Sequence, residues 1–370
     1  MLTLTAIAAL FMLQPQPADP AQKPPVRGRY TVIKITGDLD SDRLVTAFGA
    51  ELDSAKDANL IVIELDGNRA RLDVVSKLGA RIKASPAPVS VLLKDSVDKK
   101  VGVGELLLGP YASACYIDPS TTIEETPAAD IRFLAPADTS WESVERDVTG
   151  ALWTRLGQRQ ADQTLSQVLL SGRNDWWVVP SEGEHPWRLA QQAPAGGQSG
   201  AQPHQFIWAS SSGPTVRFDA DSAIGLRVCD AKAPNMNPIL ADAHLMARST
   251  RSNRTITSGL ADAQAAASRI LDDAKLAVRR IGNTLTVKGT QAHPATPDDY
   301  RAAGKSALDQ IERASRELER VEKMLADYPE LERRPGTPAK KSPGPVRATV
   351  DSLRKELDKH KTAARDFQTR

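Results

Sequence analysis

The chain has 370 residues with 41% hydrophobic content, so it is long enough for more than one domain and can fill at least one sizeable core. Residues 1–235 carry 23 basic and 28 acidic side chains and residues 236–370 carry 25 and 18, so the formal net charge of +2 conceals a front near −5 and a tail near +7. A basic helical tail is commonly a solvated surface, and we expect no nucleic-acid partner.

The first 25 residues have the pattern of a secretory signal followed by a Pro-rich leader. Leu2–Leu13 is an uninterrupted apolar run, too short to span a bilayer, that leads into the polar Gln14–Pro25. Because no Lys or Arg precedes this run and no A-x-A cleavage site follows it, a frayed apolar terminus is the alternative interpretation. No later run approaches about eighteen apolar residues, so we expect an exported protein, periplasmic or extracellular, without a transmembrane helix after the signal.

Beyond the leader, strand and helix patterns alternate. The predicted elements are a strand at Tyr30–Thr36, a helix within 41–57, a strand at Leu60–Leu65, a helix over 72–82 and a strand at Val89–Leu93. The strands are short and apolar, the helices carry apolar residues three and four apart, and Pro86 and Pro88 end the second helix. This alternation predicts an α/β domain with a largely parallel sheet.

The pattern then becomes irregular. Residues 141–172 are predicted to be helical, and residues 173–215 are loop-rich, with the Gly- and Gln-containing run Ala193–Gly200. A stretch of this length and composition predicts a surface insertion. Its tryptophans are expected to cover the edge of a core rather than to bind a ligand; they are Trp176, Trp177 and Trp187.

Residues 240–370 are predicted to be helical. Three segments carry apolar residues at alternating spacings of three and four, separated by Pro- and Gly-containing links. Their seam residues are Leu260, Ala263, Ala267, Ile270, Ala274, Ala277 and Ile281, then Ala307, Ile311, Ala314, Leu318, Val321, Leu325 and Tyr328, then Val346, Val350, Leu353, Leu357, His360, Ala364 and Phe367. This pattern predicts a coiled-coil hairpin or a small antiparallel bundle, within one chain or between chains, and the narrow seams favour helix partners over a membrane surface.

The cysteines and histidines predict neither a metal site nor a cofactor. Cys115 and Cys229 have no C-x-x-C or other metal-ligand spacing, and we expect two small buried side chains. In an oxidising compartment they could pair, but the sequence does not show whether they lie within reach of each other. The histidines are scattered, without H-E-x-x-H or a paired metal spacing; they are His185, His204, His244, His293 and His360.

Five segments of the front region resemble one protease family in their order and spacing. They are Tyr30–Asp40, Leu60–Asp66, Ile82–Val89, Asp118–Ile123 and Phe218–Val228. Together they resemble the NfeD and signal-peptide-peptidase-A type of ClpP-class serine proteases, within the wider ClpP/crotonase superfamily. The resemblance implies a ClpP/crotonase-like domain at 28–235, interrupted by the insertion at about 173–215. It also implies self-association into a homo-oligomer.

The resemblance further implies three catalytic parts, and this chain departs from each. The family uses a serine nucleophile, a lysine base that takes its proton, and backbone N–H donors from a Gly-Gly turn that stabilise the oxyanion. The serine falls at Gly102 or Val103, depending on a one-residue choice of alignment, and Gly104 is interpreted as a relic of the oxyanion turn. Arg69 and Ala70 stand where the Gly-Gly pair is expected.

The lysine position is also degenerate. The predicted helix that matches the lysine-bearing segment reads Ser143-Val144-Glu145-Arg146, and Val144 is the matched position. A neighbouring arginine stays protonated near neutral pH and cannot act as the base. The sequence therefore predicts a non-catalytic homologue, or pseudo-enzyme, that acts in assembly or in binding a peptide or protein through its groove or its helical tail.

Two enzymatic alternatives stay open. The first is an active serine peptidase with a relocated dyad, for which the candidates are Ser96 or Ser113 with Lys94, Lys99 or Lys100. The second is a crotonase-like acyl-CoA enzyme, which needs two backbone donors in Gly-rich turns rather than a fixed nucleophile. Arg69 argues against that enzyme, although Gly102 or Gly104 could retain one donor.

Overall fold

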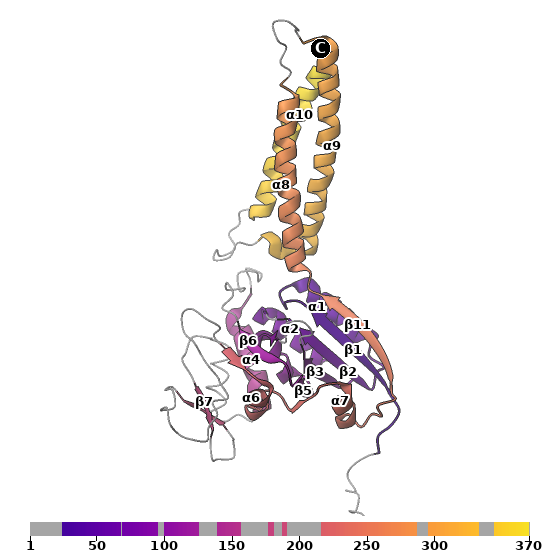
Figure 1. The fold of residues 1–370 in the computed structure, drawn as a ribbon, viewed down its shortest axis with the longest axis vertical. Coiled ribbons are helices and arrows are strands. Elements are labelled where there is room, and N and C mark those ends of the chain that lie inside the picture. The colour runs from indigo at the N-terminus through magenta and orange to yellow at the C-terminus, as the bar shows by residue number, and fades with distance from the viewer. Residues whose placement is uncertain are drawn as a thin grey trace, which may run out of the picture.

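The computed structural model describes residues 24–67, 69–94, 100–125, 139–156, 177–180, 187–190, 216–286, 295–332 and 344–369. Within them, the chain forms an α/β domain on which a bundle of three long helices stands (Figure 1). The expected fold class, a parallel-sheet core with helices followed by a helical region, is confirmed. The predicted signal segment and most of the predicted insertion lie outside the described residues.

The core of the α/β domain is a six-stranded sheet in the order β10-β5-β3-β2-β1-β11. Its strands are β1 (Arg29–Thr36), β2 (Leu60–Asp66), β3 (Val89–Leu93), β5 (Ala114–Ile117), β10 (Ala231–Lys232) and β11 (Thr250–Thr257). Every neighbouring pair is parallel, as the alternation of strands and helices predicted. All five residues of β3 are buried, because helices cover both faces at the centre of a parallel sheet.

Alternate side chains of the sheet enter two cores. Ile33, Ile61 and their same-face neighbours pack against α1 (Asp42–Ser54) and α2 (Leu72–Lys83). Val32 and Leu60 point to the other face, where α7 (Met236–Asp242) covers them. Because all six strands run parallel, their carboxyl ends, and the loops that follow them, lie along one edge of the domain.

Smaller elements complete this domain. They are β4 (Lys100–Val101), α3 (Val103–Leu106), η1 (Gly109–Tyr111), β6 (Thr122–Glu125), α4 (Trp141–Leu156), β9 (Val216–Phe218) and α6 (Ala220–Gly225). The strands β4, β6 and β9 form a second sheet, and α4 packs on α2 and η1. Of the helix predicted over 141–172, the part beyond α4 lies outside the described residues. The predicted insertion contains an antiparallel hairpin, β7 (Trp177–Pro180) with β8 (Trp187–Ala190).

The sheet extends further along the chain than the predicted boundary near residue 240. β11 pairs in parallel with β1 over eight residues, from Arg29 opposite Thr250 to Thr36 opposite Thr257. Thr250–Thr257 therefore belongs to the α/β domain, although the sequence grouped it with the helices. Seven of its eight residues are exposed and Ile256 alone is buried, so this edge strand has no apolar alternation to reveal it.

The helical region is an antiparallel three-helix bundle within one chain. Its helices are α8 (Leu260–Thr284), α9 (Pro297–Asp327) and α10 (Pro345–Thr369). The predicted α9 seam is buried from Ala307 to Leu325, and its last residue, Tyr328, is partly buried just after the helix. In α8, Leu271 and Val278 occupy core positions where the heptad pattern placed Ile270 and Ala277, which are partly buried. A straight helix drifts relative to a strict heptad, which accounts for these one-residue shifts. No helix in the described ranges combines the length and apolarity needed to cross a membrane.

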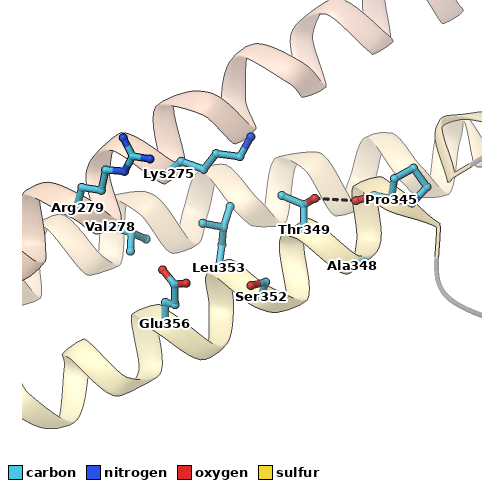
Figure 2. A pocket seen from close by; sticks show the side chains of 9 residues that line it. All are labelled: Lys275, Val278, Arg279, Pro345, Ala348, Thr349, Ser352, Leu353 and Glu356. Atoms are coloured by element: carbon cyan, nitrogen blue, oxygen red, sulfur yellow. Dashed lines mark hydrogen bonds between the residues drawn. The ribbon is translucent and has the colours of Figure 1, made fainter. Parts of the chain in front are cut away.

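The helices α8 and α10 flank a cavity near the start of α10 (Figure 2). A cavity of about 440 Å³ lies between them, with Lys275 and Arg279 of α8 on one side and Glu356 of α10 on the other. Val278 and Leu353 contribute its apolar lining. Both helices instead pack along α9, which therefore holds the bundle together.

Candidate functional site

The positions matched to the serine turn and the oxyanion turn meet at the carboxyl edge of the sheet. The first turn leads into α3 and the second follows β2. The Gly102 N–H donates to the Gly67 carbonyl oxygen at 3.1 Å. A Cβ atom placed on Gly104 would lie 2.2 Å from the Cβ of Ala70, so the glycine is needed for this close contact. The structure therefore brings together two turns that lie more than thirty residues apart in the sequence.

The matched nucleophile positions are packed into the protein. Gly102 is buried and Val103 is 1% exposed, with its side chain in the main core. Behind them, a Cβ atom on Gly67 would meet the Gly37 carbonyl oxygen at 2.5 Å and a carboxylate oxygen of the fully buried Glu105 at 3.0 Å. Protein atoms therefore occupy the space beside this turn, and neither Gly102 nor Val103 offers a nucleophilic atom.

The backbone of the matched oxyanion turn is bonded to the loop after β1. The Leu39 N–H donates to the Arg69 carbonyl oxygen at 2.8 Å, and the Arg71 N–H donates to the Leu39 carbonyl oxygen at 2.9 Å. The half-exposed Arg69 guanidinium also donates to an Asp38 carboxylate oxygen from Nε at 2.8 Å and from a terminal nitrogen at 2.7 Å. These backbone hydrogen bonds and the Arg69–Asp38 ion pair hold the matched turn against the loop after β1.

The matched lysine position contributes to packing. Val144 is half-buried on α4, one turn before the core residue Val148. Asp147 anchors the same helix, accepting hydrogen bonds from the Tyr111 hydroxyl at 2.8 Å and the Ser76 hydroxyl at 2.7 Å. The exposed Arg146 pairs with Glu142 within the helix at 3.0 Å. At the matched position itself, the Val144 side chain has no atom that could take a proton.

The structure separates Ser113 from Lys94, the lysine of one relocated dyad. Ser113 precedes β5 and its N–H donates to Val89 at the amino end of β3, whereas Lys94 follows the carboxyl end of β3. A five-residue strand spans roughly 16 Å, so these two residues lie at opposite ends of the strands. Lys94 instead lies 3.5 Å from Asp118, and Lys100 lies 2.9 Å from Glu124. Ser96 and Lys99 lie outside the described residues.

A buried charge cluster beside these turns was not predicted from the sequence. Arg71 is 0% exposed and its guanidinium contacts Asp73 at 2.6 Å, Asp42 at 3.3 Å and Glu330 at 3.4 Å. Glu330 belongs to η3 (Pro329–Glu332), the short helix at the base of the bundle, and also accepts the Asp42 N–H at 3.0 Å. The bundle thus docks on the same carboxyl edge through a buried ion pair.

Asp40 lies within this cluster and is 7% exposed. Burial, together with the negative charges of Asp38 and Glu330, raises its pKa to about 7, against the opposing effect of Arg71 and Arg69. Its Oδ1 atom has no hydrogen-bond partner among the described residues. The only sequence signal at this place was charge in the loops that follow two predicted strands, and such charge is usually solvated.

No family model matches this chain. A search of curated proteins also found no match. Among solved structures, the chain is similar to the 1510-N membrane protease specific for a stomatin homolog from Pyrococcus horikoshii, with 12% identity, a TM-score of 0.39, and coverage of 64% of this chain and 96% of that one. It is also similar to ClpP1 from Listeria monocytogenes, with 10% identity, a TM-score of 0.35, and coverage of 56% and 94%. An enoyl-CoA hydratase from Shewanella pealeana matches with 9% identity, a TM-score of 0.31, and coverage of 54% and 63%.

Proposed function

We propose that this protein is a non-catalytic homologue of the ClpP-class serine proteases that acts in assembly or in binding a peptide or protein. The observation that carries the proposal is the Gly102-Val103-Gly104 turn, in which Gly102 and Val103 are buried, Gly104 packs against Ala70, and the Gly102 N–H is hydrogen-bonded to Gly67. A serine-type reaction needs an accessible nucleophile, a base and preorganised donors. Gly102 and Val103 carry no nucleophilic side-chain atom, Val144 stands at the matched base position, and Arg69 and Ala70 stand where the Gly-Gly donor pair is expected.

The joint between the two regions supports a role in assembly. Arg71 and Glu330 are both buried, and Arg43 reaches across the same joint to Asp327 at 3.5 Å and over the ring of Tyr328 at 5.0 Å. A Cβ atom on Gly259, which has φ +68°, would lie 2.5 Å from the Tyr328 hydroxyl. These contacts fix the direction of the bundle, so a partner bound to its helices would be held at a set position relative to the α/β domain.

The proposal includes self-association and export to a periplasmic or extracellular compartment. The apolar run Leu2–Leu13 supports export, and the family resemblance supports a homo-oligomer. Sedimentation of the purified protein should give a mass above the 40.0 kDa of one chain. In a host carrying the full chain, the protein should appear in the exported fraction, and deletion of residues 2–13 should retain it in the cytoplasm.

The catalytic part of the proposal is tested with a serine-directed phosphonate probe and a casein digest. We expect neither labelling nor hydrolysis by the purified full chain. Labelling of Ser96 that is lost in Lys94→Ala or Lys99→Ala would instead establish a relocated dyad. The matched control is Ser120→Ala, because Ser120 is an exposed serine whose hydroxyl donates to Asp118 at 2.8 Å and which belongs to none of the candidate dyads.

A further inference from the structure

The only two cysteines of the chain meet inside the α/β domain. Cys115 lies in β5 and Cys229 follows α6, 114 positions later, and their Sγ atoms are 3.5 Å apart. Both side chains are buried, with 0% and 1% exposed. A disulfide bond requires the sulfurs to approach each other by about 1.5 Å more, which a change in side-chain torsion can supply when the backbones are already close.

The backbones on either side are held close by hydrogen bonds. The Asp230 N–H donates to the Cys115 carbonyl oxygen at 2.7 Å, and the Cys115 N–H donates to an Asp230 carboxylate oxygen at 2.8 Å. The Cys229 N–H donates to the Ala223 carbonyl oxygen at 3.1 Å. Because β5 and β10 are paired in parallel directly after these residues, the two sulfurs meet in a fixed register.

The surroundings favour the pair over other uses of cysteine. A Cβ atom on Gly109 would lie 2.7 Å from the Sγ of Cys115. On that side of the sulfur there is therefore no room for a mixed disulfide with a small thiol such as glutathione. Across the described part of the chain, no group of three or more His, Cys, Asp or Glu side chains is arranged to hold a metal ion. Burial, and to a lesser extent the contact with Cys115, raises the pKa of Cys229 well above its usual value. In the folded protein Cys229 therefore forms the reactive thiolate only rarely.

We propose that Cys115 and Cys229 are a disulfide site, oxidised while the chain folds in an oxidising compartment. The two thiols lose two protons and two electrons and form one S–S bond. A disulfide-class oxidant, such as oxidised glutathione, accepts both and is released as two thiols. The bond would tie β5 to the segment after α6 and close the loop that contains the predicted insertion. This inference does not depend on the proposed loss of catalysis, since neither cysteine belongs to the serine, base or oxyanion positions.

The test refolds reduced, urea-unfolded full chain in a mixture of reduced and oxidised glutathione. After denaturation, maleimide labelling and intact-mass measurement should show no free thiol, a mass lower by two hydrogens, and no glutathione adduct. The folded, reduced protein treated with oxidised glutathione should form the disulfide at least about tenfold more slowly than the chain that is oxidised during refolding. The reason is that both thiols are buried in the folded state. Two labelled thiols, a glutathione adduct or a disulfide between chains would each overturn the proposal.

The matched variant is Cys229→Ala, which leaves Cys115 alone. The urea midpoint of the wild type should rise on oxidation and fall again when a reductant is added, whereas the midpoint of the variant should not depend on the redox state. An oxidised wild type whose midpoint equals that of its reduced form would also contradict the proposal, because a bond that closes so long a loop constrains the unfolded chain. The wild-type mass measurement does not require any variant to fold.

Discussion

The core of the three-helix bundle and the carboxyl edge of the α/β domain bury different kinds of side chain. The described core of the three-helix bundle is apolar, with Ala, Leu, Ile and Val on its facing seams. The carboxyl edge of the α/β domain instead buries charged side chains, among them Arg71, Asp73 and Glu105. A helical seam can be filled by any apolar residue of suitable size, whereas a buried charge requires a specific partner. The comparison indicates that the joint, rather than the bundle core, determines how the two regions fit together.

The largest expected effect comes from removing the centre of the buried charge cluster. Arg71→Ala removes the cation of the buried Glu330 and leaves the buried Asp73 only its ion pair with the partly exposed Lys77, so we expect a loss of about 3–5 kcal/mol in the free energy of unfolding. Arg69→Ala is the matched control, because its ion pair with Asp38 is half-exposed, and it should cost less than about 1 kcal/mol. Urea unfolding curves measure both losses, and equal values would refute the contrast between buried and exposed charge.

An apolar truncation in the bundle should have the next largest effect. Leu318 is 0% exposed in α9, so Leu318→Ala should cost about 2–5 kcal/mol through lost burial and a residual cavity. Leu276, 47% exposed on α8, is the control, and Leu276→Ala should stay within about 0.5 kcal/mol of the wild type. A fluorescence-monitored urea titration checks both. A large loss for Leu276→Ala would indicate that a second chain covers this helix face.

Titration of Asp40 should give a smaller, pH-dependent effect. Its pKa in the folded protein is raised from 3.8 to about 7, so the folded state favours the protonated form. The stability that the folded state gains from binding this proton on Asp40 is fully present below about pH 4. It is lost as the pH rises through about 7. Between about pH 5 and 7 we expect a loss of about 2 kcal/mol in the wild type.

The variant Asp40→Asn, which cannot ionise, should flatten this part of the stability curve. Thermal unfolding at a series of pH values is the measurement, and Asp53→Asn, an exposed position on α1, serves as the control. An unchanged slope in Asp40→Asn would show that another group titrates in this range.

The smallest expected effect is on catalysis. Gly102→Ser or Val103→Ser alone should give no peptidase activity above the wild type, because under the proposed function the base and the donors are also lost and such groups act as a unit. A variant that also carries Val144→Lys, Arg69→Gly and Ala70→Gly is the comparison. Peptide hydrolysis by either single variant would show that a base and an oxyanion hole survive in this chain.

Much of the fold could be predicted because it depends on local apolar patterns. The strands around Val62 and Val91 and the helices α1 and α2 have the expected periodicities. The strand β11 could not be predicted, since its exposed polar residues form a strand only through pairing with β1. Tertiary pairing overrides local pattern at such an edge.

Parts of the candidate site could likewise be predicted from the sequence, and other parts could not. The two turns matched to the protease family were identified from residue order, and the structure brings Gly104 of one and Ala70 of the other into contact. The cluster around Arg71 was missed because Glu330 lies 259 positions away and nothing in the local sequence links them. The contact between Cys115 and Cys229 was left open for the same reason, since separation along the chain does not give distance in space.

The late position of β11 in the sequence affects when the protein can finish folding. β1 pairs on one side with β2, which follows it closely, but its other neighbour is synthesised about 220 residues later. Until then, the β1 edge presents unpaired N–H and C=O groups that could pair with another chain. Contacts so distant in sequence slow folding and extend this exposure. A nascent chain would therefore depend on a chaperone, or on delayed folding, until residue 257 has been made.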